Sequence, residues 1–315
     1  MRTQKNPAMS KFYKALSVIA LVLIGTVVSC SKDDNNTVPL RDYNEQYVTD
    51  ITAIDDFIDH YSMAVSPDFD VTFTKITAQN PGTPLRNQSE FNLQVKYVKV
   101  DDHNITSGDV GHENEYKVYY ISLREGANEN PSYVDSAYVS YKGVTIDNDT
   151  FDQTQNPSWF RLYETVKGWQ EIVPLFKTGF YTSGGGPDPV SFTDFGAGVL
   201  FIPSGLGYYN QPKANIPSYS PLIFNFKLFE LNHIDHDLDG ILSKDEVTSE
   251  FPDPADYDSD GDGTANLFDV DDDGDGIMTK YELHRDSSGN IIFEDCDNDT
   301  IPNYLDADSN GQTCN

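Results

Sequence analysis

The chain has 315 residues, of which 38% are hydrophobic and 23% are charged, and its formal net charge at pH 7 is −30. This length is enough for one sizeable hydrophobic core with appendages, or for two modest domains. Most of the negative charge lies between residues 232 and 315. Because phosphate recognition needs Lys and Arg, so acidic a segment argues against nucleic acid as a partner.

The N-terminus has the features of an export signal. Basic residues precede the apolar run ALSVIALVLIGTVV, which is too short for a comfortable membrane span. The run ends in VVSC, which resembles the bacterial lipobox, where the cysteine, here Cys30, is acylated. An ordinary signal peptide that ends near a cysteine is the alternative. The sequence therefore predicts a signal peptide over residues 1–29 and a polar tether over residues 30–40.

Lipidated Cys30 predicts attachment to a membrane, at the bacterial outer membrane or the cell surface, facing either the periplasm or the outside. The residues SKDDNN that follow Cys30 resemble acidic surface-sorting signals of some bacterial lipoproteins, with a simple solvated tether as the alternative. Two further cysteines, Cys296 and Cys314, lie in the acidic segment. An oxidising compartment predicts a disulfide between them.

Residues 41–114 predict a helix and strands that pack on the next domain. Apolar residues from Tyr43 to Tyr61 recur at steps of three and four, which is typical of an amphipathic helix, with acids such as Asp50 assigned to its polar face. Strands are expected in DVTFT, along the alternating residues from Phe91 to Tyr97, and in EYKVYYISL. We interpret the aromatic residues of this region as core.

Five motifs follow one another between Ala137 and Leu231: YVSYKG, TFDQT, ETVKGWQEIVPLFKTG, GVLFIPSGLGYY and IPSYSPLIFNFKLFEL. Their order resembles the FKBP-type peptidyl-prolyl isomerases over roughly residues 116–231, which predicts a domain at 115–231. The resemblance implies an α+β fold in which a twisted antiparallel sheet wraps over one short helix, with a proline-sized aromatic pocket between them. Carried over motif by motif, it implies the pocket residues Tyr141, Phe151, Asp152, Val166, Trp169, Tyr208, Ile216 and Phe224.

The implied reaction is rotation about an X-Pro bond, which has a barrier of about 18–20 kcal/mol because the twisted amide loses resonance. A dry apolar slot with hydrogen bonds suited to the twisted form lowers this barrier, and no proton transfer, nucleophile, metal or cofactor is needed. Trp169 is expected to form the floor of the slot, and the Val166 N–H and the Tyr208 hydroxyl to bind substrate carbonyls. Asp152 is expected to be an oriented acceptor, and not a general base.

Several residues depart from the family pattern. The connection between Gly179 and Ile202 is longer than usual and contains SGGGPDP, which predicts a long loop beside the pocket mouth that selects substrates or covers the site. Thr165 stands where an apolar residue is usual and Tyr209 where Gly is usual, so altered pocket polarity is expected. Phe160 is expected to join the pocket.

The segment 232–315 repeats one spacing of acidic residues four times. In DHDLDGILSKDE, Asp stands at positions 1, 3 and 5, Gly at 6, Ser at 9 and Glu at 12, with a carbonyl ligand expected at position 7, as in calcium-binding loops. Further copies begin at Asp258, Asp271 and Asp295. The second and fourth end in Asp and resemble thrombospondin type 3 repeats more than full EF-hands, and the fourth has Thr300 in place of Gly.

The predicted calcium ligands are those at positions 1, 3, 5, 9 and 12 of these loops, with position 7 of the first and third: Asp235, Asp237, Asp239, Ile241, Ser243, Glu246, Asp258, Asp260, Asp262, Asn266, Asp269, Asp271, Asp273, Asp275, Ile277, Thr279, Glu282, Asp295, Asp297, Asp299, Asn303 and Asp306. A solvated, disordered acidic tail is the alternative. The fourfold repeat favours calcium. Because a strand leads directly into the first loop without the incoming helix of an EF-hand, the calcium is expected to be structural.

These patterns together predict an exported lipoprotein that catalyses prolyl isomerisation during the folding of exported proteins and acts on proline-containing polypeptides. Two alternatives remain. The first is a catalytically weak FKBP-like module that binds proline peptides. The second is a calcium-dependent adhesive or docking protein whose acidic segment is the working part.

Overall fold

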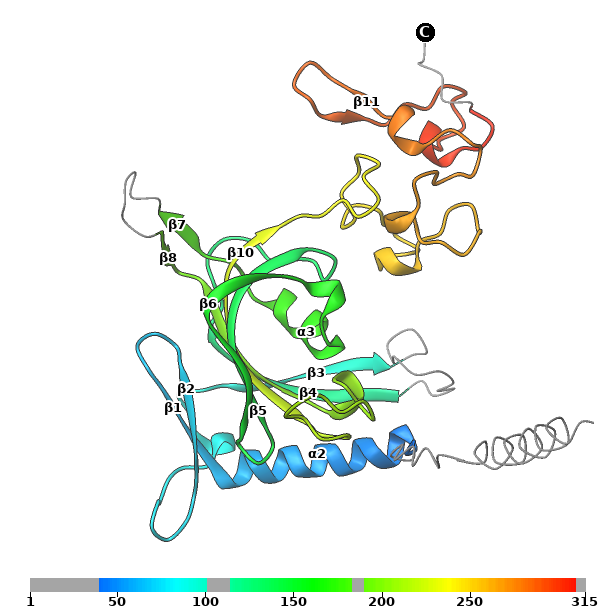
Figure 1. Ribbon diagram of the computed structural model, residues 1–315. Helices are drawn as coiled ribbons and strands as arrows, with labels where there is room; N and C mark the ends of the chain where they lie inside the picture. The colour runs from blue at the N-terminus through cyan, green and yellow to red at the C-terminus, as the bar shows by residue number, and fades with distance from the viewer. Residues whose placement is uncertain (1–39, 101–113, 183–189, 310–315) are drawn as a thin grey trace, which may run out of the picture. The chain divides into compact units, whose positions relative to one another are not determined.

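The computed structural model describes residues 40–100, 114–182 and 190–309 (Figure 1). The predicted signal peptide, Cys30, most of the tether and Cys314 lie outside these residues. Cys296 is disulfide-bonded. Among the described helices, none has the length and apolar character that crossing a membrane requires.

A large antiparallel sheet is the framework of the fold. Its strand order is β3-β4-β9-β10-β5-β6, and every neighbouring pair is antiparallel. The predicted mixture of helix and antiparallel sheet is therefore confirmed. The strands are β3 (Leu93–Val100), β4 (Asn114–Arg124), β5 (Ser136–Thr145), β6 (Thr150–Arg161), β9 (Gly196–Ile202) and β10 (Leu222–Asn232).

The two faces of the sheet support two separate apolar clusters, because side chains alternate along each strand. In β9, Leu200 and Ile202 join one cluster, while Val199 and Phe201 join the other. The first cluster surrounds the short helix α3 (Lys167–Ile172), which lies inside the curve of the sheet (Figure 1). This is the face that holds the candidate pocket.

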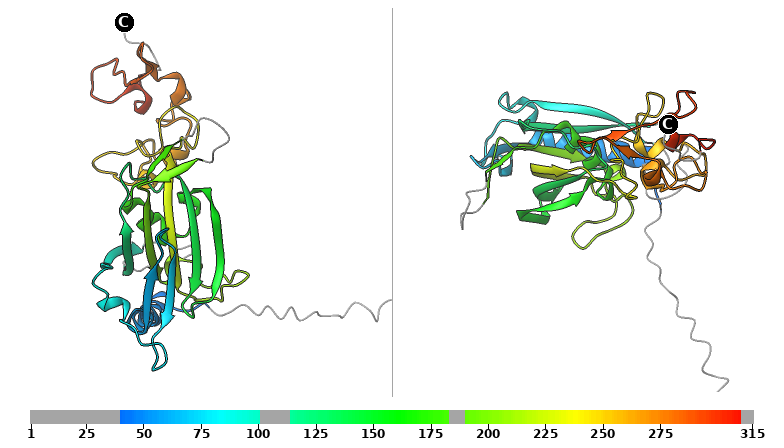
Figure 2. Two further views of the ribbon diagram at one scale, coloured as in Figure 1. Left: turned by 90° about the vertical axis from the view of Figure 1, so that its left-hand side faces the viewer. Right: turned by 90° about the horizontal axis from the view of Figure 1, so that it is seen from above.

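The second face is covered by the N-terminal region. Helix α2 (Tyr43–His60) begins at Asp42, whose carboxylate accepts the Asn44 and Glu45 N–H groups, and it ends where the chain enters β1 (Tyr61–Val65). β1 pairs with β2 (Val71–Lys75), and this hairpin lies over the strands of the sheet (Figure 2, left). Both the predicted helix and the strand predicted in DVTFT are present.

The long connection between Gly179 and Ile202 contains a second hairpin. β7 (Phe180–Thr182) pairs with β8 (Ser191–Thr193), so the described part of this segment is ordered and is not an irregular loop. The Phe192 ring packs against Phe229 at 5.2 Å and Tyr138 at 5.9 Å between ring centroids. These contacts hold the hairpin near the last residues of β10.

The remaining described elements are a small hairpin and eight short 3₁₀ turns. β11 (His284–Arg285) and β12 (Ile291–Ile292) form a small hairpin in the acidic segment, and each of the last three acidic loops closes with a 3₁₀ turn at its positions 9 to 11. The 3₁₀ turns are η1 (Leu85–Asn87), η2 (Leu162–Glu164), η3 (Val173–Leu175), η4 (Ser204–Leu206), η5 (Pro254–Asp256), η6 (Asn266–Phe268), η7 (Thr279–Tyr281) and η8 (Asn303–Leu305).

Candidate functional sites: an aromatic pocket and four acidic loops

A cavity of about 730 Å³ lies between α3, strands β5, β6 and β10, and the turn after β9. Thr165 and Phe160 contribute to its lining. Among the residues that the family resemblance implied, five line it: Tyr141, Val166, Trp169, Tyr208 and Phe224.

Trp169 is the buried floor of this cavity, because its side chain projects from α3 and is 3% exposed. The rings of Tyr141 and Phe224 each meet the indole edge-on, with centroids 5.3 Å away. Edge-to-face contacts of this kind favour a fixed arrangement of the rings. The cavity therefore has an aromatic wall of mutually packed rings.

Phe151, Asp152 and Ile216 do not line the cavity but support residues that do. The Phe151 ring packs edge-on against Phe224 at 5.4 Å, and Ile216 is 6% exposed within the same apolar cluster. Asp152 is exposed and accepts a hydrogen bond from the Tyr141 hydroxyl. These three residues therefore contact or accompany the lining without contributing to it.

The hydrogen bond to Asp152 fixes the protonation of Tyr141. Burial raises the pKa of the Tyr141 hydroxyl, and the adjacent Asp152 carboxylate raises it further. The Gln153 N–H donates to the other oxygen of Asp152 at 2.8 Å. Asp152 is thus an oriented acceptor held by two donors.

Gly143 makes room for Phe151, a requirement that the sequence motifs did not reveal. Gly143 on β5 pairs with Asp152 on β6, and a Cβ at Gly143 would lie 2.5 Å from ring atom Cε2 of Phe151. The Phe151 ring therefore lies directly over the glycine. Any larger residue there would push the ring away from Phe224.

Tyr208, in the turn after β9, also lines the cavity and has a protonated hydroxyl. Burial is the main cause that raises its pKa, and Asp152 adds to the shift. The Lys213 ammonium lies 5.0 Å from the centroid of the Tyr208 ring. A neutral hydroxyl on a lining residue can donate a hydrogen bond.

Helix α2 holds the turn that leads to Tyr208. Asp50 accepts hydrogen bonds from the Ser204 N–H at 2.7 Å, the Ser204 hydroxyl at 2.6 Å and the Gln46 amide at 2.6 Å. Asp50 is 1% exposed, which corrects its assignment to the polar face of the helix. Burial raises the pKa of Asp50, and these hydrogen bonds oppose the increase. A buried acid thus joins the N-terminal region to η4, whose Gly205 and Leu206 line the cavity.

At two departures from the family pattern, the side-chain hydroxyl donates to a backbone carbonyl. The Thr165 hydroxyl donates to the Leu162 carbonyl at 2.6 Å, so its hydrogen-bond donor is already used within the same turn. The Tyr209 side chain lies outside the lining: its ring stacks on Tyr43 at 4.0 Å and its hydroxyl donates to the Arg41 carbonyl at 2.6 Å. The expectation that Tyr209 alters the pocket is therefore wrong.

Part of the acidic segment contributes to the cavity lining. None of the described residues of the long connection between Gly179 and Ile202 lines the cavity, and the SGGGPDP stretch expected beside the mouth lies outside the described residues. Asp253, Ala255 and Asp256 of the η5 region do line it. The Tyr133 hydroxyl donates to the Asp253 carboxylate, and the Tyr163 ring meets Phe268 at 5.3 Å.

The four acidic loops share one internal hydrogen-bond pattern. In each, the position-9 side chain accepts the backbone N–H of position 2, as for Ser243 from His236, Asn266 from Ser259, Thr279 from Asp272, and Asn303 from Cys296, at 2.9 to 3.1 Å. The position-9 N–H donates to the carbonyl of the residue before the loop. The position-9 side chains, predicted as ligands, thus close the loops from within.

The position-1 carboxylates also hold the backbone. Each accepts the N–H of position 6, which has positive φ in every copy. Glycine meets this requirement in the first three loops, whereas the fourth has Thr300 at φ 84°. A β-branched residue in this conformation is strained.

Most of the predicted carboxylate ligands converge within loops. Positions 1, 3 and 5 form a group in the second, third and fourth loops, and Asp306 groups with Asp297 and Asp308. Asp235, Asp269 and Glu282 join none of the groups formed by the described residues. Ile241 and Ile277 donate their N–H groups to the position-5 carboxylates at 2.7 and 2.6 Å.

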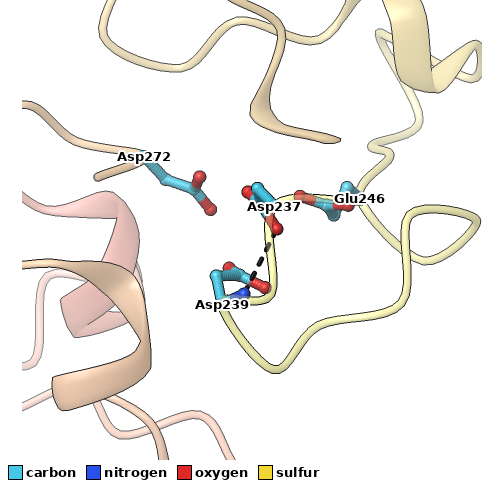
Figure 3. Close-up of side chains that lie close together, drawn as sticks. All are labelled: Asp237, Asp239, Glu246 and Asp272. Carbon is cyan, nitrogen blue, oxygen red and sulfur yellow. Dashed lines mark hydrogen bonds between the residues drawn. The ribbon is translucent and has the colours of Figure 1, made fainter. Parts of the chain in front are cut away.

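The first loop differs, because Asp237, Asp239 and Glu246 group with Asp272 of the third loop (Figure 3). Burial raises the pKa of Glu246 to about 9 and that of Asp272 to about 8, and neighbouring carboxylates add to both shifts. In the third loop, burial and the adjacent Asp273 raise the pKa of Glu282 to about 8. All the grouped ligand atoms are carboxylate oxygens, which hard cations such as Ca²⁺ prefer. The donor set therefore fits calcium.

Curated relatives of the chain are isomerases. FKBP-type peptidyl-prolyl cis-trans isomerase FkpA of Escherichia coli K12 is 30% identical over 115 residues, or 36% of this chain and 37% of that protein. The probable FkpA of Neisseria meningitidis serogroup B is 28% identical over 116 residues, with the same coverage. A probable FKBP-type 25 kDa isomerase of Pseudomonas aeruginosa is 25% identical over 111 residues, or 35% of this chain and 42% of that protein. The matches thus span well under half of these relatives.

Two solved structures that match the chain are also named as peptidyl-prolyl isomerases or FkpA. The crystal structure of Escherichia coli FkpA matches with a TM-score of 0.31 and 29% identity, covering 36% of this chain and 48% of that one. An isomerase from Pseudomonas syringae matches with a TM-score of 0.31 and 23% identity, covering 44% and 80%. Because both TM-scores are low, the homology to isomerases is inferred from sequence identity and not from these structural matches.

A family model described as the C-terminal part of BamM matches residues 236–293, within the acidic segment. It is not an FKBP model, so this part of the chain has relatives of another kind. The resemblance predicted from the motifs is confirmed at modest identity: over about a third of its length, the chain is homologous to the FKBP-type peptidyl-prolyl cis-trans isomerases.

Proposed function

We propose that the chain catalyses cis-trans isomerisation of X-Pro bonds in polypeptides. The observation that carries this proposal is the aromatic cavity floored by Trp169, in a chain with isomerase relatives that are 25–30% identical over about a third of its length. The homology supports an isomerase-like function for that part of the chain alone. Catalytic turnover and the choice of exported proteins as clients are proposals.

The cavity lowers the rotation barrier by binding the twisted amide better than the planar one. The prolyl ring lies on Trp169 between Tyr141 and Phe224, where water that stabilises the planar, dipolar amide is excluded. The Val166 N–H and the Tyr208 hydroxyl donate to substrate carbonyls on either side of the rotating bond. Because no proton leaves the substrate, Asp152 orients Tyr141 and is not required as a base.

The test is a proline-limited refolding or peptide-exchange assay on residues 31–315. Uncatalysed exchange takes tens to hundreds of seconds at 25 °C, so a modest acceleration is measurable. Tyr208→Phe should reduce the rate constant, whereas Tyr97→Phe, at an exposed position on β3, should not. Binding of a proline peptide without any acceleration would favour the alternative of a catalytically weak binding module.

We further propose that the acidic loops bind calcium as a structural ion, at the weak affinities of about 10⁻⁴–10⁻³ M seen in extracellular modules. Buried carboxylate oxygens without hydrogen-bond partners in Asp239, Glu246 and Glu282 support this. Calorimetric titration of the EDTA-treated full chain measures binding. Absence of a signal at millimolar calcium would refute it, and a partner that binds the chain in calcium alone would favour the adhesive alternative.

We also propose that acylated Cys30 anchors the mature protein at the outer membrane or cell surface. Two or more acyl chains bind a membrane stably, whereas one chain is marginal. Cys30→Ser should move the protein from the membrane fraction to the soluble fraction after export. If the variant stays in the membrane fraction, the anchor lies elsewhere.

A further inference from the structure

Asp272 is the acid that the repeat does not explain. It occupies position 2 of the third loop, where the other three loops have His236, Ser259 and Cys296. Its backbone N–H donates to the Thr279 hydroxyl at 3.1 Å, as position 2 does in every loop. Its carboxylate is absent from the group that positions 1, 3 and 5 of its own loop form.

The Asp272 side chain instead lies against the first loop. One oxygen each from Asp237, Asp239, Glu246 and Asp272 lies within 4.8 Å of all the others. Figure 3 shows Asp272 reaching this group from a separate segment of the chain, on the side opposite Glu246. The two segments are remote in sequence.

Three of the four residues are buried, and six of the eight carboxylate oxygens have no hydrogen-bond partner; Oδ1 of Asp237 and of Asp239 accept the N–H groups of Asp239 and Ile241. Asp272 is 1% exposed, Asp239 2% and Glu246 4%. Both carboxylate oxygens of Asp272, both of Glu246, and one each of Asp237 and Asp239 are buried without a hydrogen bond. Among the described residues, none of the four forms a salt bridge.

Four such carboxylates repel one another unless a cation lies among them. Leaving a buried charge unpaired is strongly unfavourable, and no Lys or Arg neutralises these. A donor set made of carboxylate oxygens alone, without His or Cys, fits a hard divalent ion. Calcium suits it better than magnesium, because calcium takes six to eight protein oxygens and tolerates irregular geometry.

We propose that Asp272 is a ligand of the calcium ion in the first loop, so that one ion joins the first and third loops. This inference rests on the proposed calcium binding and adds a ligand from outside the repeat. The ion closes residues 247–271 into a ring of chain that includes η5 and the whole second loop. Loss of this one ligand should therefore loosen a long segment as well as weaken one site.

The test compares calcium stoichiometry and double variants of the full chain. Equilibrium dialysis with calcium should show one bound ion fewer for Glu246→Gln and one fewer for Asp272→Asn, and the double variant should lose no further ion. The control pair combines Asp272→Asn with Asp262→Asn of the second loop, and it should lose two. Each substitution keeps side-chain size, and the near-ultraviolet circular dichroism of the calcium-free proteins checks that they fold alike.

Proteolysis gives a second readout. Calcium should slow cleavage within residues 247–257 in the wild type and much less in Asp272→Asn, while Asp245→Asn, an exposed acid paired with Lys244, should match the wild type. The inference is overturned if Asp272→Asn keeps the wild-type stoichiometry and protection while Glu246→Gln loses an ion. A wild-type chain that binds no calcium would instead refute the calcium proposal itself.

Discussion

The contact between Asp50 and η4 predicts that the N-terminal helix controls the pocket. Replacing Asp50 with Ala leaves the Ser204 N–H and the Gln46 amide without an acceptor, in residues that are 0% and 3% exposed. Each buried donor left unsatisfied costs about 1–3 kcal/mol. Removing a carboxylate whose burial is itself unfavourable offsets part of this cost. We expect the free energy of unfolding to fall by about 2–4 kcal/mol.

Urea denaturation followed by tryptophan fluorescence measures this change, because Trp169 lies in the pocket. The matched control is Asp56→Ala on the same helix, whose exposed side chain pairs with His60, and a change within about 0.5 kcal/mol is expected for it. In activity assays without urea, Asp50→Ala should also raise the KM for a proline peptide more than it lowers kcat, because η4 contributes to the cavity lining. Equal effects of the two variants on stability and on KM would refute the reasoning.

Three further predictions concern single features. Gly143→Ala should displace the Phe151 ring, lower the free energy of unfolding by about 1–3 kcal/mol and weaken peptide binding, as measured by denaturation and titration. Thr300→Gly should stabilise the fourth loop by about 1 kcal/mol by removing backbone strain, and an unchanged melting curve in EDTA would contradict this. The pKa of Glu246 is raised from 4.5 to about 9 by burial, so the calcium-free fold binds more protons than the unfolded chain between these pH values. Its stability in EDTA should therefore fall as pH rises through this window, and saturating calcium should abolish the fall in thermal unfolding.

The sequence predicted elements whose patterns are local. The spacing of Tyr43, Ile54, Phe57 and Ile58 identified α2, because all four lie on the buried face of the helix. The loop spacing also located the position-6 turns, since positive φ at Gly240 follows from the repeat itself. Both patterns depend on neighbours within a few residues.

Features that depend on distant neighbours were not predictable. The burial of Asp50 is set by Ser204, far along the chain, so the periodicity placed it with the polar residues. Asp272 looked like one more acid in a run of acids, because its partners belong to another loop. The family motifs similarly could not separate Phe151, which contacts the lining, from Phe224, which lines the cavity.

The strand order also dictates when the domain can fold. β10 is the last strand of the sheet in sequence, yet it lies between β9 and β5 and so joins the β3-β4-β9 half to the β5-β6 half. Until it is added, the halves have no strand pairing to each other, and Tyr141 lacks its ring contact with Phe224. Such long-range pairing is slow to form. A chain synthesised from its N-terminus must therefore wait for residue 232, and the aromatic cavity is among the last parts of the sheet domain to assemble.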